Sequence, residues 1–197
     1  PKPSSAASDV YKRQSHTNII QFVTIATLGN SQDFGDYTLH TAREGRGSNS
    51  IRAVFGGGTR AEPTISGVID YITIATKGNA TDFGDLSVSR RDTAGVASPV
   101  RVVFGGGKTP SVSDVMDYVS IATQGNAVDF GDITTHGNQD GASHGSNLTR
   151  SVNHVNSDAN TIEFVTIATL GNTQDFGDAT HVSDSKGGID NSNGSIA

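Results

Sequence analysis

The chain has 197 residues and carries 14 Lys and Arg against 20 Asp and Glu, so its formal charge is -6. Because it contains no Cys, disulfide scaffolds, thiolate zinc sites and Cys nucleophiles are excluded. No apolar run approaches the ~18 residues of a membrane-spanning helix, and the acidic balance lacks the basic stripe that nucleic-acid binding requires. Hydrophobic residues make up 34% of the chain without its 24 Gly, and with Gly counted the share only approaches the roughly 45–50% of globular domains, a figure that includes Gly. Any core is therefore thin and repetitive.

Residues 1–17 match no other part of the chain and are predicted to be a non-repeat leader, either artefactual or disordered. Residues 4–14 resemble the translated adapter sequence found at the ends of metagenomic contigs. At the other end, residues 181–197 are predicted to be a polar Gly/Ser/Asn tail or the start of a truncated next repeat. Asn193–Ala197 resembles Ser48–Ala53, which leads into a repeat. We therefore expect a fragment of a longer array.

Between these ends, residues 18–180 contain one sequence block four times. It runs from Ile20 to Asp36 and begins again at Ile69, Met116 and Ile162. The marker glycines of the four copies, Gly29, Gly78, Gly125 and Gly171, are 49, 47 and 46 residues apart. Self-similarity at this period predicts an array of repeated β units, each too small to bury its own sheet faces alone.

The second copy shows the predicted elements of one unit. Residues 69–76 alternate with apolar or small residues on both faces, which predicts a strand covered on both sides. Gly78-Asn79 predicts a two-residue hairpin turn, after which residues 81–86 return as a strand. Residues 51–55 and 100–104 predict strands that end in tight bends at Gly56–Gly58 and Gly105–Gly107. No segment predicts a helix.

The segments between copies, residues 40–50, 90–98 and 136–146, are rich in Gly, Ser, Asn and Asp and predict loops. Aromatic residues, in contrast, return at fixed repeat positions, which predicts rings packed between units. A row of rings that binds sugars or bases is the alternative. The repeated aromatics are Phe22, Tyr71, Tyr118 and Phe164; Phe34, Phe83, Phe130 and Phe176; and Phe55 and Phe104.

The order of these features resembles a kelch repeat. Arg52-Ala-Val-Phe-Gly-Gly-Gly58 recurs from Arg101, and it is followed by a Tyr, a later aromatic and an Arg, as in Tyr71, Phe83 and Arg90. Phe stands where kelch units carry Trp, and the gap from Tyr to this ring is longer than in that family. The resemblance implies an all-β, kelch-like β-propeller of four repeats of 46–49 residues, either a closed small ring or a partial arc of a larger propeller. The repeated block also resembles kelch-like proteins of uncultured marine phages.

Three sets of residues were considered as sites. Asn79, Asp82 and Asp85, with their counterparts, place three oxygen ligands within seven residues and suggest calcium, but turn residues that accept amide hydrogen bonds are favoured. The glycine runs lack the helix and Lys of a phosphate loop and predict turns. His136, His144 and His154 gather in one inter-unit segment, where the glycine block is lost. We assign no catalytic, cofactor-binding or metal-binding residue and expect no cofactor.

We therefore expect a non-enzymatic scaffold that binds a protein or glycan ligand through loops 37–50, 86–99 and 133–149, which differ between units. The phage resemblance implies a structural protein associated with a virion or tail, and a virion or extracellular location. A fragment of an extracellular carbohydrate-active propeller enzyme is one alternative. A fibre or filament subunit, which self-associates through repeat edges, is another. Neither nucleic acid nor membrane is expected as a partner.

Overall fold

The computed structural model describes residues 17–60, 64–135, 143–154 and 160–181. The predicted leader (residues 1–17) and the predicted tail (residues 181–197) lie outside them, except for Thr17 and His181. Within these ranges the chain forms fourteen strands and no helix, as the sequence predicts. A helix long and apolar enough to cross a membrane is accordingly not found in this part of the chain.

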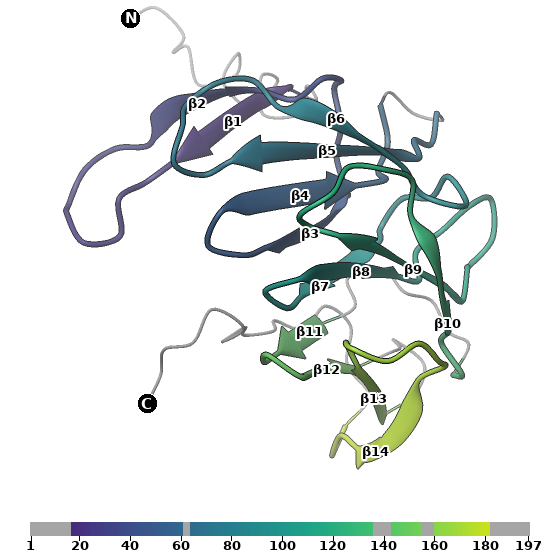
Figure 1. The fold of residues 1–197 in the computed structure, drawn as a ribbon. Helices are drawn as coiled ribbons and strands as arrows, with labels where there is room; N and C mark the ends of the chain where they lie inside the picture. The colour runs from purple at the N-terminus through teal and green to yellow at the C-terminus, as the bar shows by residue number, and fades with distance from the viewer. Residues whose placement is uncertain (1–16, 61–63, 136–142, 155–159, 182–197) are drawn as a thin grey trace, which may run out of the picture.

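The strands form four antiparallel sheets that follow one another along the chain (Figure 1). The first sheet has two strands, and each of the others is a four-stranded meander, so the repeat is also structural. The sheets are β1 (Ile19–Phe22) and β2 (Gln32–Asp36); β3 (Gly45–Ser48), β4 (Arg52–Gly56), β5 (Val68–Thr73) and β6 (Thr81–Asp85); β7 (Ala94–Ala97), β8 (Arg101–Gly105), β9 (Val115–Ser120) and β10 (Val128–Asp132); and β11 (Ser143–Ser146), β12 (Arg150–His154), β13 (Thr161–Thr166) and β14 (Gln174–Asp178).

Consecutive sheets pack face to face, so each sheet has a leading face toward the preceding sheet and a trailing face toward the following one. On β5, Ile72 belongs to the apolar cluster shared with the first sheet, whereas Ile69 belongs to the cluster shared with the third. The prediction of a strand covered on both sides is thus confirmed. A third cluster lies between the third and fourth sheets, and it includes Met116 and Phe130 from one and Val165 from the other.

The segments predicted as inter-unit loops contain the first strand of each four-stranded sheet, and that part of the prediction is wrong. Strands β3, β7 and β11 lie side by side where the sheets approach one another most closely. A Cβ on Gly95 would overlap the backbone of Arg46 in the preceding sheet, and a Cβ on Gly47 would lie 2.6 Å from Val102. Small residues are therefore required by packing, although the same composition is typical of loops.

The predicted two-residue turn at Gly78-Asn79 is also wrong. The chain reverses earlier, in the turn from Thr73 to Thr76, where the amide of Thr76 donates to the carbonyl of Thr73 at 3.1 Å. Gly78 and Asn79 instead lie against the preceding sheet. A Gly-Asn pair is a strong local turn signal, but here contacts between units determine its conformation.

The triple glycines form the tight bends that the sequence predicts. Gly57 and Gly58 have φ values of 79° and 99°, which favour glycine. The amide of Gly58 donates to the carbonyl of Arg90 at 2.9 Å, so the bend also allows a neighbouring backbone to approach closely.

The array is open in the described residues. No strand ladder or apolar cluster there joins β1–β2 to β11–β14. Figure 1 shows the sheets fanned from the purple first sheet to the yellow-green last one. The part of the chain that the structure describes is thus an all-β array of antiparallel sheets of two to four strands, and within it each end sheet has a neighbouring sheet on one face only.

Candidate functional site

The Asp-Phe-Gly-Asp tetrads form one half of a junction that recurs between consecutive sheets, and the Gly-Asn pairs form the other half. At the junction between the second and third sheets, the amide of Gly125 donates to the carbonyl of Phe83 at 2.8 Å. In return, the amide of Asp85 donates to Oδ1 of Asn126 at 3.1 Å. The same bonds join Gly78 and Asn79 to Phe34 and Asp36, and Gly171 and Asn172 to Phe130 and Asp132.

The glycine of each tetrad leaves room for this contact. A Cβ on Gly84 would lie 2.5 Å from the carbonyl oxygen of Gly125, and Gly131 has the same relation to Gly171. Gly84 also has a φ of 148°, which L side chains rarely adopt. Both the space and the backbone conformation therefore require glycine at the centre of the junction.

Each unit contains a pair of perpendicular aromatic rings on its trailing face. In the second sheet the ring centroids of Tyr71 and Phe83 are 5.7 Å apart, within the range of favourable edge-to-face pairs. Phe83 is only 3% exposed because the third sheet covers it. The prediction that these rings pack between units is confirmed for Phe34, Phe83 and Phe130, and Phe104 is also fully buried. Phe176, in contrast, is 56% exposed.

An arginine covers the first ring of the pair in each of the three four-stranded sheets, and in the second and third sheets it also reaches the next sheet. The Cζ atom of Arg52 lies 4.7 Å from the centroid of Tyr71, close enough for a cation–π interaction. Its Nη1 donates to the carbonyl of Ile121 in the following unit at 2.8 Å. Arg101 repeats both contacts with Tyr118 and with the carbonyls of Ile167 and Ala168.

Sequence reasoning missed a set of buried acids on the leading faces. Asp70, Asp117 and Glu163 occupy the same position in β5, β9 and β13, and each is at most 5% exposed. Each accepts hydrogen bonds from a hydroxyl of the preceding unit: Thr38 at 2.7 Å, Ser87 at 2.6 Å and Thr134 at 2.6 Å. An acidic residue that recurs in the middle of an apolar strand was the available signal, since such a residue is buried only when it is paired.

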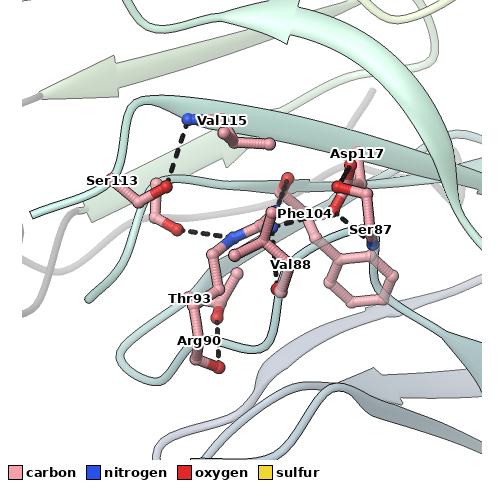
Figure 2. Close-up of polar contacts among 9 residues, drawn as sticks. Ser87, Val88, Arg90, Thr93, Phe104, Ser113, Val115 and Asp117 are labelled. Atoms are coloured by element: carbon pink, nitrogen blue, oxygen red, sulfur yellow. Dashed lines mark hydrogen bonds and ion pairs between the residues drawn. The ribbon is translucent and has the colours of Figure 1, made fainter. Parts of the chain in front are cut away.

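Asp117 also forms a fully buried ion pair with Arg90, whose side chain, like that of Asp117, has no exposed surface (Figure 2). Arg90 Nη1 lies 2.8 Å from Asp117 Oδ2, and the other guanidinium nitrogens donate to the carbonyls of Gly106 and Phe104. Burial lowers the pKa of Arg90 from its usual value, while Asp117 acts in the opposite direction. At Asp70, which has no such partner, burial raises the pKa of the carboxyl.

The connections between sheets gather at one edge of the array, here called the loop edge: residues 37–44 and 86–93 with residues 57–60, 64–67 and 106–114. Backbone bridges join Ala42 to Thr59 and Arg91 to Lys108, so each connection pairs with a loop of the next sheet. Residues 136–142 of the third predicted binding loop lie outside the described residues. The described parts of loops 37–50, 86–99 and 133–149 thus contribute both to this edge and to the strands beside it.

Two loops of the loop edge touch each other across a unit boundary. Arg43 and Asp92 hold the same place in successive connections and have φ values of 63° and 56°. The amide of Asp92 donates to the carbonyl of Arg43 at 2.8 Å, and Arg43 Nε lies 3.8 Å from Asp92 Oδ1. Such left-handed conformations in residues other than glycine persist only where the surrounding structure holds them, and they often mark functional loops. The two connections of the loop edge are therefore held in fixed conformations by their contact with each other.

The calcium candidates lie at the junctions. The side-chain oxygen of Asn79 accepts the amide of Asp36, which is a structural use of this group. In the described residues, no group of three His, Cys, Asp or Glu could hold a metal ion. The proposed histidine cluster is only partly described: His136 lies outside the described residues, whereas His144 and His154 lie on β11 and β12, opposite Asn153 and Ser143 in register.

The chain matches no protein-family model, and no curated protein matches it.

Proposed function

We propose that the chain is a non-enzymatic repeat scaffold of the kelch-like β-propeller type, whose loop edge binds a protein or glycan ligand. The observation that carries the proposal is the contact between Asp92 and Arg43, which places loops of different sequence side by side. Each of these loops leads into a sheet with the same four-stranded antiparallel order. A constant frame with variable loops is the usual arrangement of a binding surface.

The propeller form is supported by the order of the strands. Each connection runs from the last strand of one sheet to the first strand of the next, and β3, β7 and β11 lie together. This is the arrangement of propeller blades around an axis. Because the array is open in the described residues, it favours an arc of a propeller over a small closed ring. A virion or tail role is supported by the phage resemblance alone.

The opposite edge, formed by the hairpin turns, is the poorer binding surface because its backbone groups are used at the junctions. At the loop edge, in contrast, Leu39 and Val88 are exposed. Asp92 lies 3.8 Å from both Arg43 and Arg91. Apart from the buried Arg90, the loop edge contains four cations against three acids, which leaves a small excess of positive charge in a chain that is acidic as a whole: Arg43, Arg60, Arg91 and Lys108 against Glu44, Asp92 and Asp114. Exposed apolar side chains next to cations suit a ligand with both apolar and acidic groups, such as an acidic glycan or an acidic protein surface.

The non-enzymatic assignment is supported by what the buried acids contact. Asp117 is paired with Arg90, and Glu163 accepts hydrogen bonds from Thr134 and Thr173. These carboxylates join one unit to the next and are closed off from solvent. Their role is therefore structural.

A printed array of neutral and acidic glycans tests the glycan form of the proposal. We expect binding to an acidic glycan, and we expect the double variant Leu39→Ser/Val88→Ser to bind at least about tenfold more weakly. Val128→Ser is the matched control, because Val128 is exposed on β10 away from the loop edge. Equal binding by both variants, or no binding to any arrayed glycan, would contradict the glycan form.

A further inference from the structure

The two ends of the array expose the two halves of the junction that joins the sheets internally. On the trailing face of the last sheet, Phe176 is 56% exposed, whereas its counterparts Phe34, Phe83 and Phe130 are at most 9% exposed. A Cβ on Gly177 would meet nothing within 4 Å, whereas Gly84 has the backbone of the next unit against it. The tetrad at residues 175–178 is therefore a junction half without a partner in the described residues.

The leading face of the first sheet is the complementary half. Val23 and Ile25 are 59% and 99% exposed, whereas their counterparts in the third sheet, Val119 and Ile121, are 3% and 1% exposed beneath the preceding unit. The amides of Gly29 and Ser31 correspond to donors that bond a preceding tetrad at each internal junction. In the described residues, no tetrad lies against them.

The last sheet also contains a hollow that a side chain of the first-sheet hairpin could occupy. At the first internal junction, Lys77 Nζ lies 4.7 Å from the ring centroid of Phe22 and donates to Gln32 Oε1 at 3.3 Å. The last sheet offers the equivalent place, a hollow lined by Phe164, Thr166, Leu170 and Gln174, of which Phe164 and Gln174 correspond to Phe22 and Gln32. Leu28 is the counterpart of Lys77 and is fully exposed. An apolar side chain suits the ring of Phe164.

On the last sheet, Arg150 also occupies the position from which the arginines of the preceding sheets contact the following sheet. Arg150 lies over Phe164, with its Cζ atom 4.9 Å from the ring centroid, as Arg52 lies over Tyr71. Arg52 and Arg101 both use this position to donate to Ile and Ala carbonyls of the following hairpin. The corresponding carbonyls of the first hairpin belong to Ile25 and Ala26. Backbone, aromatic, hollow and arginine positions thus all match between the two ends.

We propose that the trailing face of the last sheet binds the β1–β2 hairpin of a second copy of this chain, head to tail, through the same junction that joins the sheets within one copy. The contact is heterologous, so repeated use of it yields a closed ring or a filament, depending on whether the rotation closes. This surface lies apart from the loop edge and does not depend on the proposed ligand binding.

Sedimentation velocity on the full chain over a wide concentration range tests the proposal. We expect the wild-type chain to form species that are multiples of the chain mass and that grow with concentration. Leu28→Asp disrupts the β1–β2 hairpin surface, here called the head, and Phe176→Asp disrupts the trailing face of the last sheet, here called the tail. Each variant alone should be monomeric. Mixed together, they retain one intact head and one intact tail, so we expect a one-to-one dimer. A symmetric contact between like surfaces would not give this pattern.

Two further variants protect the test against misfolding. Val100→Asp places the same charge on a similarly exposed position in the β7–β8 turn of an internal sheet, outside the junction positions, and should assemble like the wild type. Gln174→Asp replaces Phe176→Asp if circular dichroism shows that the latter unfolds. A wild-type chain that stays monomeric at all concentrations overturns the proposal. Protection of the Gly29 amide from hydrogen exchange in such a monomer would show that the site is filled by the same chain.

Discussion

At the scale of single residues, a shared repeat position does not give a shared electrostatic environment. Asp70 and Asp117 occupy equivalent places, and each accepts a hydrogen bond from a hydroxyl group of the preceding unit. Only Asp117 faces a buried cation, because only the second connection carries an arginine at the position of Arg90. The repeat therefore provides an internal comparison between a carboxylate without a buried ion pair and one with such a pair.

We predict that Asp117→Asn lowers the free energy of unfolding by about 3–5 kcal/mol, because it leaves the guanidinium of Arg90 buried without a counter-charge. Asp70→Asn should cost only roughly 1–2 kcal/mol, because the amide oxygen still accepts one of the hydrogen bonds that the hydroxyl and the backbone amide of Thr38 donate to the carboxylate. Urea unfolding of both variants measures the difference. Equal losses would mean that the ion pair contributes no more than its hydrogen bonds.

At the scale of strands, the sequence predicted those strands in which apolar and polar side chains alternate. It did not predict the strands whose backbones lie directly against the backbone of a neighbouring sheet. The strand over residues 69–76 was predicted and is found as β5. Strands β3, β7 and β11 were missed because their small and polar residues resemble a loop; in β3 and β7 the neighbouring sheet leaves no room for a side chain at Gly47 and Gly95. The turn at Gly78-Asn79 was misplaced for the same reason. Likewise, the pairing of Arg90 with Asp117 joins residues 27 positions apart that no local pattern connects.

We predict that Phe83→Ala lowers the free energy of unfolding by about 3–5 kcal/mol, because it opens a cavity between the second and third sheets. The matched variant, Phe176→Ala, removes the same ring from the same place in a unit, but from a face where the ring is 56% exposed and no described sheet covers it. At concentrations where the chain is monomeric, it should cost about 1 kcal/mol or less. Thermal unfolding of the pair separates the contribution of the junction from that of the ring itself. A similar loss in both variants would place the stabilisation within the unit.

At the scale of the whole molecule, each apolar cluster lies between two consecutive sheets, so stability is transmitted from neighbour to neighbour. Among the described residues, the fourth sheet has a neighbouring sheet on its leading face only, and the buried apolar residues that it contributes there are Val165 and Ile167. The second and third sheets are covered on both faces. The array should therefore open from its ends, and the fourth sheet is held by one junction.

We predict that Phe130→Ala, which removes the ring between the third and fourth sheets, loosens β13 and β14 without loosening β4 and β5. Hydrogen exchange of the backbone amides measures this. A loss of about 3 kcal/mol at that junction corresponds to exchange about a hundredfold faster in β13 and β14. Phe83→Ala is the control, because it weakens a junction between two internal sheets and should also affect β5 and β6. Uniform acceleration by Phe130→Ala across all four sheets would mean that the array unfolds as one cooperative body, so that the repeats are no longer separate units of stability.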